Sequence, residues 1–158
     1  MNKFRVERLN HNRRDHFEDL FNQYNFYLGE ISREKPLTKR MGERLFDSEP
    51  VLFMALRSYA ESIPVGFIRL YSMYSSANAV MTTIINDLYV LPDYRNNGIA
   101  LKLIEAAVKF AINNKSALIQ LETLQDNLIA QKLFESVGFK SQTSDSELNV
   151  YYIRFEFH

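Results

Sequence analysis

The hydrophobic pattern of the N-terminal third of the chain predicts a short strand followed by two helices. Between Phe4 and Leu9, apolar side chains alternate imperfectly with charged ones, as in a half-buried strand. Thr38 is a candidate N-cap for a second, short helix. Before it, apolar residues recur at steps of three and four and so share one face of a first helix; they are Phe17, Leu20, Phe21, Tyr24, Tyr27 and Leu28.

From Val51 the pattern changes to that of a sheet. Val51–Leu56 is a continuous apolar run, which is typical of a buried strand. Val65–Tyr71 and Met81–Val90 predict the next two strands, with a turn at Ser58–Pro64 and a polar loop at Ser72–Asn78 between them. Three consecutive strands with short connections predict an antiparallel meander.

The C-terminal half alternates between helices and strands. Gly98–Asn113 has a broad apolar stripe, which predicts a helix lying on a sheet. A strand at Ala117–Thr123 follows, and then a helix that Asn127 caps and Gly138 ends. Leu148–Phe157 predicts a terminal strand rich in aromatic residues. With no repeat or linker in the sequence, we expect one mixed α/β domain over residues 1–158.

The composition is that of an ordinary globular domain. Of 158 residues, 46% are hydrophobic and 24% are charged, which excludes wholesale disorder. The 19 basic and 19 acidic residues cancel, so the chain lacks the positive charge that non-specific nucleic-acid binding and attachment to anionic lipid require. We therefore expect neither nucleic acid nor a membrane among its partners.

The residues that are missing exclude several kinds of chemistry. Without cysteine there are no disulfides, thiol nucleophiles or cysteine-bound zinc. The sequence has three histidines, His11, His16 and His158, and no second group of histidines that could complete a metal site with them, so no metal is expected. No run approaches the roughly 20 apolar residues of a membrane span, and the first residues lack the apolar core of a secretory signal. We expect a cytoplasmic protein whose reaction uses oxygen, nitrogen and backbone groups.

The junction between Val90 and Ala100 is the most informative part of the sequence. A strand ends at Pro92, a turn rich in Asn follows, and the long helix begins at once. The first amides of a helix have no internal partner and lie at the positive end of its dipole. Gly98 lets the backbone approach an anion and Arg95 adds a charge, so a phosphate or pyrophosphate suits this turn. The alternative is a plain turn, in which Asn and Gly supply unusual backbone angles and Arg95 is solvated.

Two motifs in this region resemble those of the GNAT superfamily of acyl-CoA-dependent N-acyltransferases. The segment Arg95-Asn96-Asn97-Gly98-Ile99-Ala100 is similar to the family's Arg/Gln-x-x-Gly-x-Gly/Ala motif, and it follows a hydrophobic-x-Pro segment, as in the family. A strand separates it from the second signature, Asn-x-x-Ala-x-x-Leu-Tyr-x-x-x-Gly-Phe. That signature aligns with Asn127, Ala130, Leu133, Phe134, Gly138 and Phe139.

The resemblance implies a fold and a cosubstrate. The fold is a single-domain α/β (α+β type) GNAT fold, with a mixed, mostly antiparallel, twisted sheet of about six to seven strands flanked by about four helices. The cosubstrate is acetyl-CoA, with its pyrophosphate on backbone amides and its pantetheine arm between two diverging strands, those at Leu88–Val90 and Ala117–Thr123. Asn127 would bind the arm while capping a helix, or cap alone. The implied acetyl-CoA-binding residues are Leu88, Tyr89, Val90, Arg95, Asn96, Asn97, Gly98, Ile99, Ala100 and Asn127.

The general acid departs from the family pattern. The family usually has a tyrosine at position 134 to protonate the departing thiolate, and Phe134 has no proton to give. Because a thiol with a pKa near 8.5 leaves readily as the thiolate, we expect a less acid-assisted reaction. Tyr89 is the candidate replacement, with Tyr94, Tyr151 and Tyr152 as alternatives.

The candidate general base is Asp87, an acidic residue inside an otherwise apolar strand. The alternative is an ion-paired Asp87 with no chemical role. Because Asn86 and Asp87 both disfavour a regular strand, they also predict a β-bulge, a feature that often lies beside a functional site.

The predicted acceptor site is formed by the first helices, with Tyr24, Tyr27 and Glu30 holding an amine or, alternatively, serving as core aromatics and a solvated charge. We expect an N-acetyltransferase that transfers the acetyl group of acetyl-CoA to a primary amine of a small molecule. Direct attack is expected because neither a cysteine nor a serine–histidine pair is available to carry the acyl group. The alternatives are a protein or peptide N-acetyltransferase, and a non-catalytic acyl-CoA-binding regulatory domain.

A homodimer is also expected. The terminal segment Val150–Phe157 is apolar enough to be an aggregation risk as an exposed edge strand, so a second copy would cover it.

Overall fold

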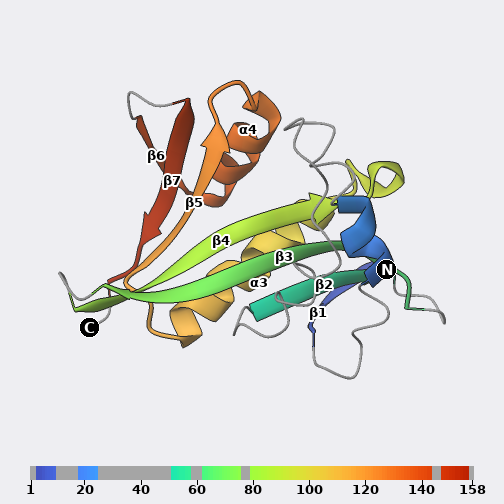
Figure 1. Cartoon of the computed structure of the whole chain (residues 1–158), viewed down its shortest axis with the longest axis horizontal. Helices are drawn as coiled ribbons and strands as arrows, with labels where there is room; N and C mark the ends of the chain where they lie inside the picture. The colour runs from blue at the N-terminus through green and yellow to red at the C-terminus, as the bar shows by residue number, and fades with distance from the viewer. Residues whose placement is uncertain are drawn as a thin grey trace.

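The computed structural model describes residues 3–9, 18–24, 51–57, 62–75, 79–143 and 147–156. Its strands form one mixed sheet in the order β1-β2-β3-β4-β5-β7-β6 (Figure 1). The strands are β1 (Phe4–Arg8), β2 (Val51–Arg57), β3 (Pro64–Ser75), β4 (Val80–Val90), β5 (Leu118–Leu124), β6 (Lys140–Thr143) and β7 (Leu148–Arg154). The helices are a segment at 18–24, α3 (Ile99–Asn113) and α4 (Leu128–Val137), and a single 3₁₀ turn, η2 (Pro92–Tyr94), precedes α3. The predicted α/β fold is confirmed. The sequence predicts about four helices, and the described part of the chain contains three.

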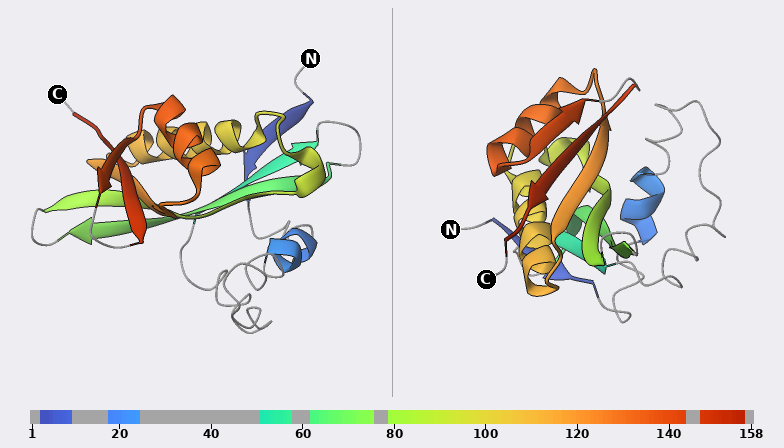
Figure 2. Two further views of the ribbon diagram at one scale, coloured as in Figure 1. Left: turned by 90° about the horizontal axis from the view of Figure 1, so that it is seen from above. Right: turned by 90° about the vertical axis from the view of Figure 1, so that its left-hand side faces the viewer.

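The helices cover the two faces of the sheet unequally. β2 to β4 form the predicted antiparallel meander, and β1 pairs antiparallel with β2 at its edge. β5 pairs parallel with β4, and β7 pairs antiparallel with both β5 and β6. α3 and α4 lie on one face, and the helical segment 18–24 lies on the other (Figure 2). A ligand held at the sheet therefore meets different side chains on its two sides.

Each face of the sheet has its own hydrophobic cluster. On the α3 face, helix residues spaced by three and four, such as Leu103, Ile104 and Ala107, are fully buried against strand residues that include Ile68. On the opposite face the buried residues of the helical segment pack on β2, β3 and β4; this cluster comprises Leu20, Phe21, Tyr24, Leu52, Met54, Leu56, Phe67 and Tyr89.

A β-bulge interrupts β4 where the sequence predicts one. Asp87 is paired with Arg69 and Ile85 with Leu70, so Asn86 is an extra residue without a partner on β3. The bulge changes which face each side chain meets. Ile85 belongs to the α3 cluster, whereas Asp87, two residues later, contacts Tyr24 on the other face.

β4 and β5 are paired at one end and diverge at the other. Their parallel pairing covers Thr82 to Ile84, where the Thr83 and Ser116 hydroxyls lie 2.7 Å apart. Beyond Ile84, β4 continues beside β3 to Val90 while β5 continues beside β7 (Figure 1). The divergence expected from the family resemblance is therefore present.

Three details of the strands differ from the predictions. β3 continues to Ser75, since the polar residues expected to form a loop pair with Val80–Thr83 as an exposed end of the hairpin. β6 was not predicted, because Lys-Ser-Gln-Thr has no apolar pattern and its backbone pairs only with β7. β7 is not an exposed edge, as it is paired on both sides, so the argument for a homodimer no longer holds.

Some predictions lie outside the described residues. They are the second helix that begins near Thr38 and the acceptor residues Tyr27 and Glu30. Across the described ranges, none of the helices has both the length and the apolar character needed to cross a membrane.

Gly66 allows β3, β4 and α3 to pack closely. A Cβ atom at this position would lie 2.8 Å from the Tyr89 carbonyl oxygen, 3.3 Å from Val90 Cγ2 and 3.4 Å from Leu103 Cδ1. We therefore expect Gly66→Ala to push β4 away from β3 and to lower the free energy of unfolding by about 1–3 kcal/mol, as overpacking does. Urea denaturation measures this, with the exposed Ser72→Ala in the same strand as control. Equal stability of the two variants would contradict the close packing.

Candidate active site

The start of α3 presents a row of backbone amides outside the hydrogen-bond ladder of the helix. Lys102 N donates to Gly98 O, the first hydrogen bond of the helix ladder. Within the described residues, none of the amides from 96 to 101 donates to another backbone group. Since the dipole of this 15-residue helix adds positive potential at the same end, the site favours an anion.

The turn before α3 exposes these amides. Asn96 and Gly98 both have positive φ, 60° and 73°, and alternation of such residues with ordinary ones turns successive N–H groups to one side. The Asn97 side chain stabilises the turn by donating to the carbonyl oxygens of Tyr94 and Arg95, each at 3.0 Å. A Cβ at Gly98 would meet no atom within 4 Å, so the space beside the glycine is open.

Two residues of β4 direct backbone groups into the gap between β4 and β5. Leu91 N donates to Val65 O on β3, and backbone direction alternates along a strand. The N–H and C=O of Leu88 and Val90 therefore point away from β3, toward the side from which β5 has diverged. Val90 O accepts a hydrogen bond from Arg95 Nε at 3.0 Å, which fits this direction. The main chain of Tyr89 faces β3, where Tyr89 pairs with Phe67.

Asn127 caps α4 across the gap, and the cap uses only half of its side chain. Its Oδ1 accepts from Ala130 N at 3.2 Å. The predicted helix cap is therefore confirmed. Among the described residues no hydrogen bond uses its Nδ2, so the amide group retains its donors.

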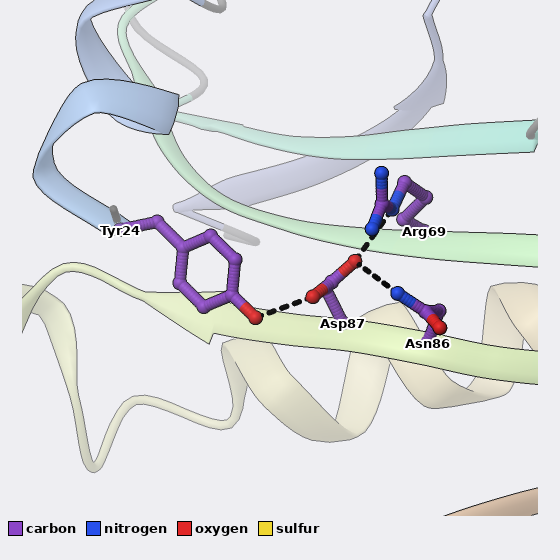
Figure 3. A network of polar contacts seen from close by, with 4 residues as sticks. All are labelled: Tyr24, Arg69, Asn86 and Asp87. Atoms are coloured by element: carbon purple, nitrogen blue, oxygen red, sulfur yellow. Dashed lines mark hydrogen bonds and ion pairs between the residues drawn. The ribbon is translucent and has the colours of Figure 1, made fainter. Parts of the chain in front are cut away.

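Asp87 is the centre of a polar network on the opposite face from α3 (Figure 3). Its Oδ1 accepts from the Tyr24 hydroxyl at 2.5 Å, and its Oδ2 accepts from Arg69 Nε at 2.5 Å and from Asn86 Nδ2 at 2.9 Å. The Arg69 and Asp87 side chains are each 9% exposed, so this is a buried ion pair. Asp87 is thus ion-paired, as the alternative interpretation expected, and it also contacts Tyr24, one of the predicted acceptor residues.

Aromatic rings hold Tyr24 over β3 and β4. Its ring meets Phe67 edge-on with centroids 5.1 Å apart, and meets Tyr89 at 5.3 Å. Arg95 Cζ lies 5.8 Å from the Tyr89 ring. Tyr89 therefore connects the Tyr24 ring to the Arg95 side chain of the turn before α3.

The alternative candidate acids, Tyr94, Tyr151 and Tyr152, lie in three different places. Tyr151 packs in the core against Phe134, which in turn packs against Phe139, in each case with ring centroids 5.9 Å apart. Tyr94 contacts Phe4 edge-on at 6.2 Å, and Tyr152 lies under Arg154 at 6.0 Å. None of these contacts joins Tyr94 or Tyr152 to Asp87.

Tyr151 is a buried phenol whose proton is directed at a carboxylate. Burial raises the pKa of the Tyr151 hydroxyl, and the nearby negative charge of Glu135 raises it further. The hydroxyl lies 3.4 Å from Glu135 Oε1 and donates to it. It therefore stays protonated at neutral pH but faces α4.

Arg69 was not among the predicted site residues. A signal for it exists in the sequence, since Arg69 is the one charged residue in the predicted strand Val65–Tyr71, as Asp87 is in the next strand. Opposite charges in adjacent antiparallel strands indicate a cross-strand pair. Its Nη1 is buried and has no hydrogen-bond partner within the described part of the chain.

A scan against known families identifies the class of protein that this fold and site define. Residues 13–139 match the model of the acetyltransferase (GNAT) family. A protein named uncharacterized N-acetyltransferase YhfO, of Bacillus subtilis (strain 168), is 32% identical over 124 residues, which cover 78% of this chain and 81% of that protein. The chain belongs to the GNAT acetyltransferase family.

Two further similarities are informative. Thialysine N-epsilon-acetyltransferase of Mus musculus is 30% identical over 82 residues, 52% of this chain and 48% of that protein. The structure of yncA from Salmonella typhimurium with its cofactor acetyl-CoA has a TM-score of 0.77 to this chain. The two chains are 12% identical, and the match covers 99% of this chain and 96% of that one. At that identity the second similarity concerns the fold alone.

The buried ion pair makes a prediction about stability. Arg69→Leu leaves the Asp87 carboxylate buried without its counter-charge, and loss of one partner of such a pair costs about 3–5 kcal/mol. Urea denaturation should show this loss, and a smaller one in Arg69→Leu/Asp87→Asn, where no unpaired carboxylate remains. The exposed Arg154→Leu is the control, expected within about 0.5 kcal/mol of the parent. Equal losses in the Arg69 and Arg154 variants would contradict the buried pair.

Proposed function

We propose that this chain is an N-acetyltransferase that transfers the acetyl group of acetyl-CoA to a primary amine of a small molecule by direct nucleophilic attack. The observation that carries the proposal is the gap between β4 and β5, with the backbone groups of Leu88 and Val90 directed into it along one wall and the amides of α3 at its end. A long ligand with an anionic end and a polar arm suits this arrangement.

The turn before α3 is proposed to hold the pyrophosphate of acetyl-CoA. Arg95, Asn96, Asn97, Gly98, Ile99 and Ala100 supply the backbone amides, and the exposed Arg95 adds a charge-assisted contact. A neutral chain can bind this anion because the positive potential comes from backbone dipoles rather than from a basic surface.

The gap between the strands is proposed to hold the pantetheine arm and the thioester. Leu88 and Val90 offer main-chain groups from one wall, while Asn127 Nδ2 donates from the other. Tyr89 contributes its ring rather than its backbone, which faces β3. A fixed N–H donor near the thioester carbonyl stabilises the oxyanion of the transition state without reorganising.

Asp87 and Tyr89 are proposed as the catalytic residues, as base and acid. Both side chains lie on the face that Tyr24 covers, next to the backbone groups of Leu88 and Val90. Supporting evidence for an amine acceptor comes from the mouse relative, whose name gives thialysine, a small amine, as its substrate.

Binding can be tested at Gly98. Gly98→Val forces a β-branched residue into a left-handed conformation and fills the open space beside the amides, so we expect at least a tenfold weaker affinity for acetyl-CoA. Isothermal titration calorimetry measures the affinity. Gly138→Val is the matched control, because Gly138 also has positive φ (106°) and open space around it but ends α4. Equal weakening by both variants would argue against the phosphate turn.

Turnover can be tested with a panel of acceptors. We expect acetyl-CoA-dependent thiol release with small primary amines, including amino acids with a side-chain amine, and little with peptides. Release with peptides alone would favour the protein or peptide N-acetyltransferase. Binding of acetyl-CoA without release for any acceptor would favour a binding domain.

A further inference from the structure

We infer that the Tyr24 hydroxyl is a proton relay between the nitrogen of the acceptor amine and the Asp87 carboxylate. This inference rests on the proposed function and assigns Tyr24 a chemical role in place of the predicted acceptor-binding one. The hydroxyl donates to Asp87 Oδ1 at 2.5 Å, so the path from Tyr24 to the carboxylate is already formed (Figure 3).

The surroundings of Asp87 favour a relay over direct proton transfer. Its side chain is 9% exposed, Oδ2 is engaged by Arg69 and Asn86, and Oδ1 is engaged by Tyr24. Three of the roughly four acceptor positions of the carboxylate are therefore occupied, and its low exposure leaves little room for direct contact with the acceptor. A phenol that gives its proton to Asp87 can accept another on the same oxygen, because a hydroxyl is both donor and acceptor.

The position of Tyr24 relative to the gap also fits this role. Asp87 precedes Leu88, whose backbone groups point into the gap, and the Tyr24 ring packs on Phe67 and Tyr89. These ring contacts hold the hydroxyl at Asp87, next to the proposed thioester position. The helical segment 18–24 thus brings an acid–base group to β4 from a distant part of the sequence.

The proton transfers balance as follows. The amine nitrogen forms a bond to the thioester carbon, the carbonyl π electrons move to oxygen, and the nitrogen becomes positively charged. That nitrogen loses one proton to Tyr24 Oη while Tyr24 passes its own proton to Asp87 Oδ1, so Tyr24 ends neutral. Collapse of the adduct re-forms the carbonyl, breaks the C–S bond and leaves the electron pair on sulfur. The thiolate then takes a proton from Tyr89, the proposed acid, which regains one from solvent.

Arg69 favours resetting of the relay. When Asp87 carries the proton, the buried Arg69 guanidinium has lost its counter-charge, and an unpaired buried cation is unfavourable. Return of the proton through Tyr24 to solvent after product leaves restores the ion pair.

The test compares Tyr24→Phe with Tyr74→Phe. Tyr24→Phe keeps the ring and removes the hydroxyl with its hydrogen bond to Asp87, so kcat should fall at least about 100-fold, within the range of positioned acid–base groups. The affinity for acetyl-CoA should stay within twofold. Tyr74 is 63% exposed near the far end of β3, and its variant should retain parental activity. The kcat of Tyr24→Phe should also rise with pH more steeply than that of the parent, as bulk base takes over.

A double-mutant cycle distinguishes a relay from a packing role. If Tyr24 and Asp87 act in one path, Tyr24→Phe/Asp87→Asn should be no slower than the slower single variant. The same cycle measured by urea denaturation without substrate should give less than additive losses, because the two groups share a hydrogen bond. Additive losses in both cycles, or a parent-like kcat for Tyr24→Phe, would overturn the relay. A parent that acetylates no amine would instead overturn the proposed function and the relay with it.

Discussion

The bulge at Asn86 is the constraint on which the site depends. Ile85 and Asp87 are two residues apart and would share a face in a regular strand. With one extra residue between them, Ile85 packs against the α3 side while Asp87 turns to Tyr24. Before the bulge, β4 contributes the buried Thr83 and Ile85 to the interior. After it, the strand directs the Asp87 side chain toward Tyr24 and the backbone groups of Leu88 and Val90 toward the gap.

The bulge lies just beyond the last residue pair that joins β4 to β5. The parallel pairing ends at Ile84, and the ladder to β3 shifts between Ile85 and Asp87. A bulge increases the local twist of its strand, which carries β4 away from β5. The same irregularity therefore accounts both for the gap and for the orientation of the side chain proposed as its base.

The sequence predicts most of the fold because the signals for it are local. Asn127 and Gly138 bound α4 as capping rules require, and the apolar runs locate β2 and β4. The prediction fails where pairing rather than side-chain pattern makes the strand. β6 has no apolar signal at all, and β7 was taken for an edge because sequence does not show what lies beside it.

In the candidate site, too, the features with local sequence signals are predictable and the contacts between distant residues are not. The bulge and the turn before α3, with its positive-φ residues, follow from local backbone preferences, so both are predictable. The Tyr24–Asp87 contact joins residues 63 positions apart and depends on how the helical segment lies on the sheet. Arg69 carried a signal, an isolated charge in an apolar strand, but its partner became clear only from the register of β3 and β4.

The Arg69–Asp87 pair is poorly explained by stability alone. Replacing a buried ion pair with hydrophobic residues of similar size is often neutral or stabilising, so the pair is weak evidence for a structural role. Among the described residues its Nη1 has no hydrogen-bond partner, so these contacts leave part of the buried guanidinium unsatisfied. What the pair does provide is a buried carboxylate held beside the bulge, with one oxygen on Arg69 and Asn86 and the other on the Tyr24 hydroxyl. A charge held in this geometry is useful to a reaction that must take a proton from an amine and then give it up.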